Sequence, residues 1–172
     1  MPARAPAFRI RRASGEQDAN LIAPLFDSYR QFYDRPANLE LARTFIRDRL
    51  KAGESVIFMA EGMAEGAPGE GGVGEGAPGP VLGFVQLYAS FSSVAARPIW
   101  VLNDLYVAST ARRLGVGRAL MEAARQHAVQ TGAKRLTLET VSENRNAWTL
   151  YESLGYVCHD PSARFYTLEL GE

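Results

Sequence analysis

The sequence predicts an α/β (α+β) protein, organised as a single domain over residues 1–172. Strand-like segments, in which polar and apolar residues alternate, are interspersed with segments whose apolar residues recur at helical spacing. A glycine-containing loop joins the strand-like residues 100–107 to one of these amphipathic helices. With 172 residues, of which 47% are hydrophobic, the chain is long enough to bury the core of one such domain.

The N-terminal part predicts a strand followed by two helices. Residues 7–11 alternate in the manner of an edge strand. Asp18 is a candidate cap for the first helix, whose apolar face is formed by Ile22, Leu25, Phe26, Tyr29 and Phe32. Asn38 is suited to begin the second helix, which carries the apolar residues Leu41, Phe45, Ile46 and Leu50.

Residues 61–80 are predicted to form a flexible loop between two strands, at residues 55–60 and 81–88. Gly, Ala, Glu and Pro dominate this segment, and the pentapeptide Glu-Gly-Ala-Pro-Gly occurs in it twice. Such a composition cannot build a packed core. Because the entropy of loop closure rises only logarithmically with length, we interpret the segment as a tolerated insertion in a hairpin turn.

The loop after residues 100–107 is a candidate phosphate site. A helix that begins just after it presents unpaired N–H groups, and Gly115 and Gly117 let an anion approach the main chain closely. The loop lacks the Gly-Lys-Ser/Thr ending of a P-loop and the third glycine of a dinucleotide fingerprint. An ordinary helix start with solvated arginines therefore remains an alternative. The side chains that can add charge-assisted hydrogen bonds are Arg112, Arg113 and Arg118.

A second segment follows in a fixed order after this loop and its helix. Residues 135–141 alternate like a strand, and Asn144 is a good N-cap for a short helix that Gly155 can end. Residues 156–170 then predict a final hairpin. The apolar stripe of the short helix consists of Ala147, Leu150, Tyr151 and Leu154.

In these two segments the chain resembles the GNAT superfamily of acyl-CoA-dependent N-acetyltransferases. Arg112-x-x-Gly115-x-Gly117 is similar to the family's pyrophosphate loop, and the helix that begins at Asn144 and contains Tyr151 is similar to its second CoA-contacting motif. The resemblance covers nearly the whole chain. It implies a mixed, mostly antiparallel sheet of about seven strands, splayed between the fourth and fifth strands and flanked by about four helices.

The resemblance also implies acetyl-CoA as the cosubstrate. Its pyrophosphate is expected on the main chain of the glycine loop, and its pantetheine arm along the exposed edge of the fourth strand. Asn144 and nearby residues are expected to flank that arm. The expected CoA-binding residues are Leu105, Tyr106, Val107, Arg112, Arg113, Leu114, Gly115, Val116, Gly117, Arg118, Asn144 and Ala147.

Tyr151 is the expected general acid, because the family's tyrosine at this position protonates the leaving thiolate. Periodicity alone leaves open that Tyr151 is a packing residue. The base is less defined: polyamine-specific relatives have a glutamate where this chain has Asn103, which cannot accept a proton. Asp104 and Glu139 remain as candidates for proton removal or for binding a cationic substrate. Glu139 is equally well interpreted as an ordinary surface carboxylate.

The aromatic residues Tyr29, Phe32 and Tyr33 are expected near the acceptor, because in the resembled family the first two helices border that side of the cleft. Tyr29 and Phe32 also fit a helical core stripe, and that alternative stays open. Two function classes remain. One is an enzyme that acetylates a small primary amine, or a protein lysine or N-terminus; the other is a non-catalytic acyl-CoA-binding module.

Composition narrows the remaining classes. A net charge of zero argues against a nucleic-acid-binding protein that relies on a basic surface. With one cysteine, Cys158, the chain cannot form an internal disulfide, and this thiol is expected to be packed. The two histidines do not have the spacing of metal ligands, so no metal is expected. No apolar stretch is long enough to span a bilayer, and a cytoplasmic location is expected. Exposed edge strands make a homodimer possible.

Overall fold

The computed structural model describes residues 8–63 and 78–159. The chain divides into two compact units, Met1–Glu139 and Thr140–Glu172, which are described separately. The elements of the first unit are β1 (Phe8–Arg12), α1 (Gly15–Phe32), α2 (Leu39–Ala52), β2 (Ser55–Met63), β3 (Pro78–Ser92), β4 (Arg97–Val107), η1 (Ser109–Ala111), α3 (Val116–Gln130) and β5 (Leu136–Thr137). The second unit contains α4 (Arg145–Ser153).

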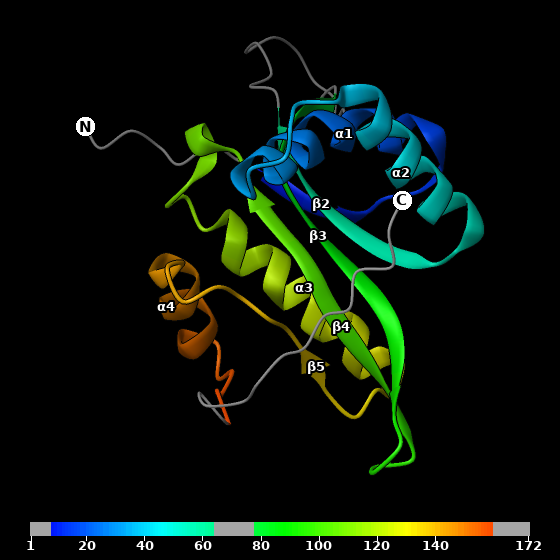
Figure 1. Cartoon of the computed structure of the whole chain (residues 1–172), viewed down its shortest axis with the longest axis vertical. Helices are drawn as coiled ribbons and strands as arrows, with labels where there is room; N and C mark the ends of the chain where they lie inside the picture. The colour runs from blue at the N-terminus through cyan, green and yellow to red at the C-terminus, as the bar shows by residue number, and fades with distance from the viewer. Residues whose placement is uncertain (1–7, 64–77, 160–172) are drawn as a thin grey trace, which may run out of the picture. The chain divides into compact units, whose positions relative to one another are not determined.

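The strands of the first unit form one mixed sheet in the order β1-β2-β3-β4-β5 (Figure 1). All neighbours are antiparallel except β4 and β5, which are parallel. The prediction of a mostly antiparallel sheet with four α-helices is therefore confirmed, but five strands are seen in the described residues, not seven. Residues 156–159 are not in a strand, and the rest of the predicted final hairpin lies outside the described residues.

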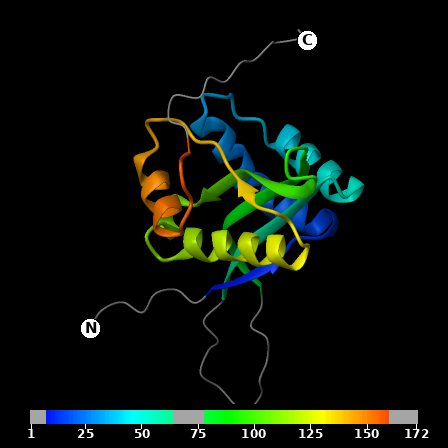
Figure 2. The same ribbon diagram turned by 90° about the horizontal axis from the view of Figure 1, so that it is seen from below.

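The sheet of the first unit is covered on both faces. Figure 2 shows α3 along one face and α1 with α2 on the other. Alternation along β3 explains this arrangement: Phe84 points into the α1/α2 layer, whereas a Cβ on the neighbouring Gly83 would lie 3.2 Å from Leu120 of α3. The same Cβ would lie only 2.8 Å from the carbonyl oxygen of Tyr106, so Gly83 lets both β4 and α3 approach the strand closely. The residues that α3 buries are Val116, Leu120, Met121, Ala124 and Ala128.

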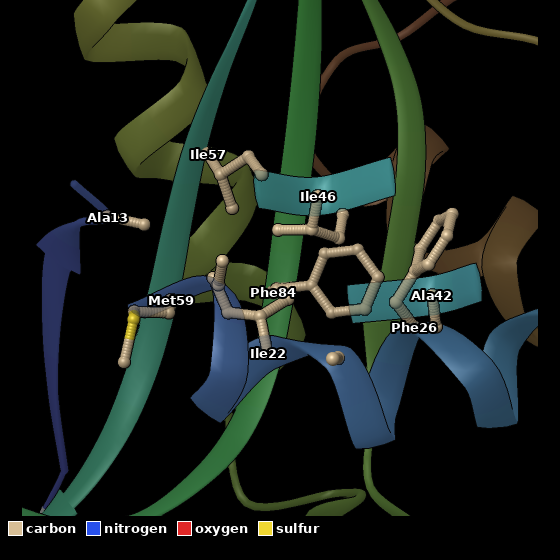
Figure 3. Close-up of a cluster of buried hydrophobic side chains, with 10 residues drawn as sticks. Ala13, Ile22, Phe26, Ala42, Ile46, Ile57, Met59 and Phe84 are labelled. Atoms are coloured by element: carbon tan, nitrogen blue, oxygen red, sulfur yellow. The ribbon is translucent and has the colours of Figure 1, made fainter. Parts of the chain in front are cut away.

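The main hydrophobic core lies between the sheet and the two N-terminal helices (Figure 3). Phe84 is fully buried, and its ring meets that of Phe26 edge-on at a centroid distance of 6.1 Å. Phe26 stacks in turn on Phe45 at 5.3 Å, so the rings join the sheet to both helices. Most of the apolar residues predicted for the two helices are in or against this core, but Phe32 and Leu41 are 56% and 48% exposed, so that part of the prediction is wrong. The buried residues of the core include Ile22, Phe26, Ala42, Ile46, Ile57 and Met59.

The helix boundaries follow local hydrogen-bonding rules. Asn38 caps α2 as predicted, since its Oδ1 accepts from the N–H of Leu41 at 3.0 Å. α1 begins at Gly15, before the predicted cap Asp18, with Ser14 at the N-cap position. Asp18 still acts at this end, because its carboxylate accepts from the backbone N–H of Ser14 at 2.7 Å.

A buried ionic network joins β1, β2 and the start of α1. Arg11 donates to both oxygens of Asp18 at 2.8 and 2.6 Å, and Glu61, which is 1% exposed, accepts from Arg9 at 2.8 Å and from Arg11 at 3.3 Å. Burial opposes ionisation of Glu61, but the hydrogen bonds from the two arginines outweigh it and hold its pKa below the usual 4.5. The hydrogen bond from Arg11 likewise lowers the pKa of Asp18.

This network corrects the predicted bounds of the 61–80 loop. Glu61 is a buried residue of β2, which continues to Met63, and β3 begins at Pro78. Composition alone wrongly predicted a loop at residues 61–63. A segment that contains glycine and glutamate can still pair as a β-strand when arginines on the adjacent strand neutralise the glutamate. Residues 64–77 lie outside the described residues, and their flexibility remains a prediction, as does the organisation of residues 1–172 as a single domain.

The second unit contains the predicted short helix. Asn144 is the N-cap of α4, although its side chain makes no capping hydrogen bond, and Gly155 has a φ of 85°, as expected for the residue that ends the helix. Cys158 is exposed, so the expectation of a packed thiol is wrong; the thiol lies after α4 outside any strand. Across the described ranges, no helix has both the length and the apolar character needed to cross a bilayer.

Replacement of Asp18 by alanine is expected to lower the free energy of unfolding by about 3 kcal/mol, because Arg11 and the N–H of Ser14 lose their partner. The lowered pKa of Asp18 means that this stabilisation is present above its ordinary pKa of 3.8 and is lost as the pH falls through the lowered value. Urea denaturation at neutral and acidic pH measures both effects.

The matched control is Asp48→Ala, which removes a carboxylate that is 46% exposed and paired with Arg47 at 3.1 Å. This change is expected to alter the free energy of unfolding by less than about 1 kcal/mol, because exposed ion pairs contribute little. Equal losses in the two variants would contradict the structural role of the Asp18 network.

Candidate active site

The loop from β4 to α3 reverses the chain through two left-handed residues. After η1, Arg112 is extended, with φ −68° and ψ 150°, and Arg113 has a φ of 63°. Gly115, at the N-cap of α3, has a φ of 84°. The left-handed conformation costs about 1–2 kcal/mol for a residue with a Cβ, so Gly115 occupies a position that favours glycine.

This turn leaves a row of main-chain N–H groups at the start of α3. The first main-chain hydrogen bond of the helix runs from the N–H of Ala119 to the carbonyl of Gly115 at 3.0 Å. Within the described residues, the N–H groups of residues 113–117 therefore have no main-chain acceptor. The positive end of the helix dipole lies at the same place. Bare amides and a positive dipole form a site that fits a phosphate group.

Three arginines add positive charge to this loop. The Nε of Arg112 donates to the carbonyl of Val107 at 3.2 Å, and its guanidinium lies 5.9 Å from the ring centroid of Tyr106. Arg112 therefore lies against the end of β4. Arg113 and Arg118 are exposed. Leu114 and Val116 anchor the loop, since Leu114 is half-buried and Val116 is only 1% exposed.

One edge of β4 is open along most of its length. β3 pairs with β4 from Arg97 to Val107, but β5 pairs with it only at Trp100 and Val101. In the part of the chain that the structure describes, residues 102–107 have no strand on that side. Leu105, Tyr106 and Val107 lie on this stretch, where main-chain groups that face the open edge can pair with an extended ligand.

A β-bulge turns Asp104 toward the α1/α2 layer. Gln86 pairs with Asp104 and Leu87 with Leu102, which leaves Asn103 as the extra residue. Asn103 is exposed, whereas Asp104 is 4% exposed and lies beside Gln86. The Nε2 of Gln86 donates to Oδ2 of Asp104 at 2.6 Å, and the Nδ2 of Asn103 donates to Oδ1 at 3.1 Å.

Gln86 and Tyr88 are two further polar residues beside Asp104 that the sequence motifs do not indicate. Both lie on the same face of β3 as Phe84, and Gln86 is fully buried. Burial, together with the charge of Asp104, raises the pKa of Tyr88 to about 12, so its phenol stays protonated at neutral pH. The signal that could have identified these residues was a glutamine at a core-facing position of an otherwise apolar strand.

An aromatic group connects the core to the surface at the end of α1. The ring of Tyr29 lies 5.1 Å from that of Tyr33 and 6.4 Å from that of Tyr106 on β4. Phe32 and Tyr33 are 56% and 39% exposed, whereas Tyr29 packs against the core. Tyr29 is therefore a packing residue of the core, as the alternative interpretation of its helical stripe expected. Its ring also connects β4 to the exposed rings. These contacts place Tyr29 and Tyr33 near the strand that carries Asp104.

Glu139 lies beyond the end of β5, is exposed and stands outside any strand. The strand predicted for residues 135–141 comprises only Leu136–Thr137, so most of that prediction is wrong. Alternation is a weak signal where pairing with a neighbouring strand is short. No group of three or more His, Cys, Asp and Glu side chains suited to a metal ion occurs among the described residues.

In the second unit, the motif residues lie on α4. The N–H of Ala147 donates to the carbonyl of Asn144 at 3.0 Å, which makes the first turn of the helix. Tyr151 is half-buried, and its ring centroid lies 6.1 Å from that of Tyr156. The N–H of Tyr156 donates to the carbonyl of Tyr151 at 3.1 Å, so the chain folds back on the end of the helix.

Comparisons with known proteins agree with these features. Residues 22–156 match the acetyltransferase (GNAT) family. The chain is 44% identical over 149 residues to the uncharacterized N-acetyltransferase YhfO of Bacillus subtilis (strain 168), covering 87% of this chain and 89% of that protein. A solved structure of a probable acetyltransferase is similar with a TM-score of 0.77 and 38% identity, over 95% of this chain and 99% of that one.

A more distant match is to the thialysine N-epsilon-acetyltransferase of Bos taurus. It is 33% identical over 90 residues, which cover 52% of this chain and 49% of that protein.

The chain therefore belongs to the acetyltransferase (GNAT) family, and it has the α+β fold of that family. It is an N-acetyltransferase, that is, an acyl-CoA-dependent transferase. Of the two function classes left open by the sequence, an enzyme and a non-catalytic acyl-CoA-binding module, the comparisons therefore support the enzyme. The family uses acetyl-CoA, and the bare amides at the start of α3 fit its pyrophosphate.

Replacement of Gly115 by alanine is expected to weaken CoA binding about tenfold, because backbone strain displaces the amides of the loop. A Cβ there would meet no heavy atom of the described residues within 4 Å, so the effect comes from the φ of 84° and not from a clash. Isothermal titration with CoA measures the affinity, and urea denaturation measures the accompanying loss of stability.

Gly53→Ala provides the matched control. Gly53 ends α2 with a φ of 66°, and a Cβ there would also be free of contacts. This variant is expected to lose about 1–2 kcal/mol of stability and to keep its affinity for CoA. A Gly115 variant with unchanged CoA affinity would show that the amides do not hold the pyrophosphate.

Proposed function

We propose that this enzyme transfers an acetyl group from acetyl-CoA directly to the primary amine of a small molecule, such as a polyamine or an amino acid, in a ternary complex. The observation that carries the proposal is the continuity of β4. One strand provides an open main-chain edge, leads into the amide-rich loop and bears the buried carboxylate of Asp104. A donor held along that edge would have its thioester close to this carboxylate.

The donor would be held mainly by the main chain. The amides of residues 113–118 would bind the pyrophosphate, with added charge from Arg112, Arg113 and Arg118. The pantetheine arm would pair with the edge at residues 105–107, and a backbone N–H there would donate to the thioester oxygen. By the resemblance of residues 144–151 to the family's second CoA-contacting motif, Asn144 and Ala147 would also contact the arm.

Asp104 is the proposed group that receives the amine. A primary ammonium with a pKa near 10.4 is neutral in only about one in 2,500 molecules at neutral pH, so the proton must be removed before attack. Asp104 would hold the cation and accept the proton directly or through water. Asn103 and Glu139 would contribute polar contacts to the substrate, and Asn103 itself cannot act as a base.

Tyr151 is the proposed general acid. A phenol has a reference pKa near 10, and a thiol resembling cysteine has one near 8.5, so the proton transfer to the leaving thiolate is about 1.5 pK units uphill. That cost is small, and a protonated phenol is available at neutral pH. Support comes from the similarity of residues 144–151 to the family's second CoA-contacting motif.

The aromatic group of Tyr29, Phe32 and Tyr33 supports a small organic cation as the acceptor. Ring faces near a carboxylate attract an alkylammonium through both cation–π and charge interactions. The name of the bovine relative specifies an amino-acid side-chain amine, which is an acceptor of this class. A protein lysine or N-terminus is a second acceptor class for the same chemistry.

The test is CoA release from acetyl-CoA, followed by thiol trapping, against a panel of diamines, amino acids and lysine-containing peptides. Release with a diamine or a basic amino acid, and little with peptides, is the expected result. Release with peptides alone would replace the small-amine proposal by protein acetylation. The absence of release with every amine, while CoA still binds, would contradict the proposed acceptor class.

Tyr151→Phe is expected to lower kcat by about 100-fold and to leave the Kd for CoA within about twofold, because it removes a proton donor and keeps the ring. Steady-state rates with the best amine and titration with CoA provide the two measurements. The matched control is Tyr156→Phe, which removes the hydroxyl of the adjacent ring and is expected to keep kcat. Equal rates in wild type and Tyr151→Phe would remove the acid role.

A further inference from the structure

Gln86 is fully buried on β3 and lies opposite Asp104 across the β3–β4 pair. No motif of the family resemblance contains it. Its side-chain amide is the donor in a 2.6 Å hydrogen bond to Oδ2 of Asp104, while Asn103 donates to Oδ1 at 3.1 Å. Both oxygens of the carboxylate are therefore held by neutral amide donors.

The hydrogen bond fixes the orientation of the Gln86 amide. An ionised carboxylate can only accept, so the nitrogen of Gln86 must face Asp104 and its Oε1 must face away. That oxygen is buried and has no hydrogen-bond partner within the described residues. A buried acceptor without a partner lowers the stability of the fold, and a glutamine that lowers stability at this position calls for a functional reason.

Asn103 cannot replace Gln86 in holding the carboxylate. Asn103 is exposed and is the extra residue of the bulge, so water competes for its amide. Gln86 is enclosed by the α1/α2 layer, and water does not compete there. The orientation of Asp104 therefore depends mainly on the buried donor.

We propose that Gln86 is a positioning residue, which holds the carboxylate of Asp104 in the orientation that receives the acceptor amine. This inference rests on the proposed role of Asp104. Gln86 acts through Asp104 and touches neither acetyl-CoA nor the reacting atoms. Its removal frees the carboxylate to rotate, which misplaces the amine, whereas the donor loop, which follows the end of β4 at Val107, keeps its main-chain conformation.

Gln86→Met keeps an unbranched side chain of similar length and removes the amide. This variant is expected to lower kcat/KM for the best amine of the panel about tenfold, mainly through KM for the amine, with KM for acetyl-CoA unchanged. Gln86→Leu repeats the measurement with a branched side chain and keeps the test valid if the first variant does not fold. Thermal unfolding and CoA titration establish that each variant is folded.

A double-mutant cycle with Asp104→Asn separates positioning from a general structural effect. Asp104→Asn alone is expected to lower kcat/KM for the amine about 100-fold, and Gln86→Met is expected to have no further effect in that background. Additive losses, or equal increases in both KM values, would overturn the positioning role. Ser55→Ala is the control, because it removes a buried hydroxyl on the same face of the sheet, one with no hydrogen-bond partner among the described residues, and is expected to leave both KM values unchanged.

The two proposals fail in different ways. If Asp104→Asn leaves kcat/KM unchanged, the proposed role of Asp104 is wrong, and the inference about Gln86 falls with it. If Asp104→Asn lowers kcat/KM and neither Gln86 variant does, Asp104 keeps its role and Gln86 has none.

Discussion

The pairing of β4 is the constraint on which the rest of the site depends. On one side, β3 holds β4 along its whole length; on the other, β5 pairs with it only at Trp100 and Val101. A strand paired along its whole length on both sides would have no free main-chain groups to bind a ligand. Because β5 ends at Thr137, β4 is paired with β3 on one side and, among the described residues, has an open edge at residues 102–107 on the other.

Two local features make this strand part of the candidate site. The bulge at Asn103 changes the side to which the following residue points, and it places Asp104 beside Gln86 under the α1/α2 layer. Beyond the strand, the left-handed conformation of Gly115 directs the amides of the loop outward at the start of α3. The position of Asp104 and the direction of the loop amides are thus set by backbone geometry.

The first two helices contribute rigidity as well as a surface. The network of Arg9, Arg11, Asp18 and Glu61 attaches the start of α1 to β1 and β2, and the rings of Phe26, Phe45 and Phe84 attach both helices to the middle of the sheet. Tyr29 extends this packing to Tyr106 on β4. The exposed rings of Phe32 and Tyr33 are therefore carried by an anchored helix.

Local signals made several elements predictable. The caps at Asn38 and Gly155 and the glycine loop before α3 depend on residues close in sequence, and the structure has them where they were expected. Predictions that depended on pairing were less successful. The strand at residues 135–141 proved short, and Glu61 was assigned to a loop although it is a buried strand residue.

The sequence by itself determined the helix periodicity, the amide-rich loop and the family resemblance, because these follow from residue types at short spacing. Only the tertiary structure decided that Asp104 is buried beside Gln86, that β4 keeps an open edge and that two arginines of β1 neutralise Glu61. Each of these requires strands distant in sequence to pair in one register, and register is a property of the whole sheet.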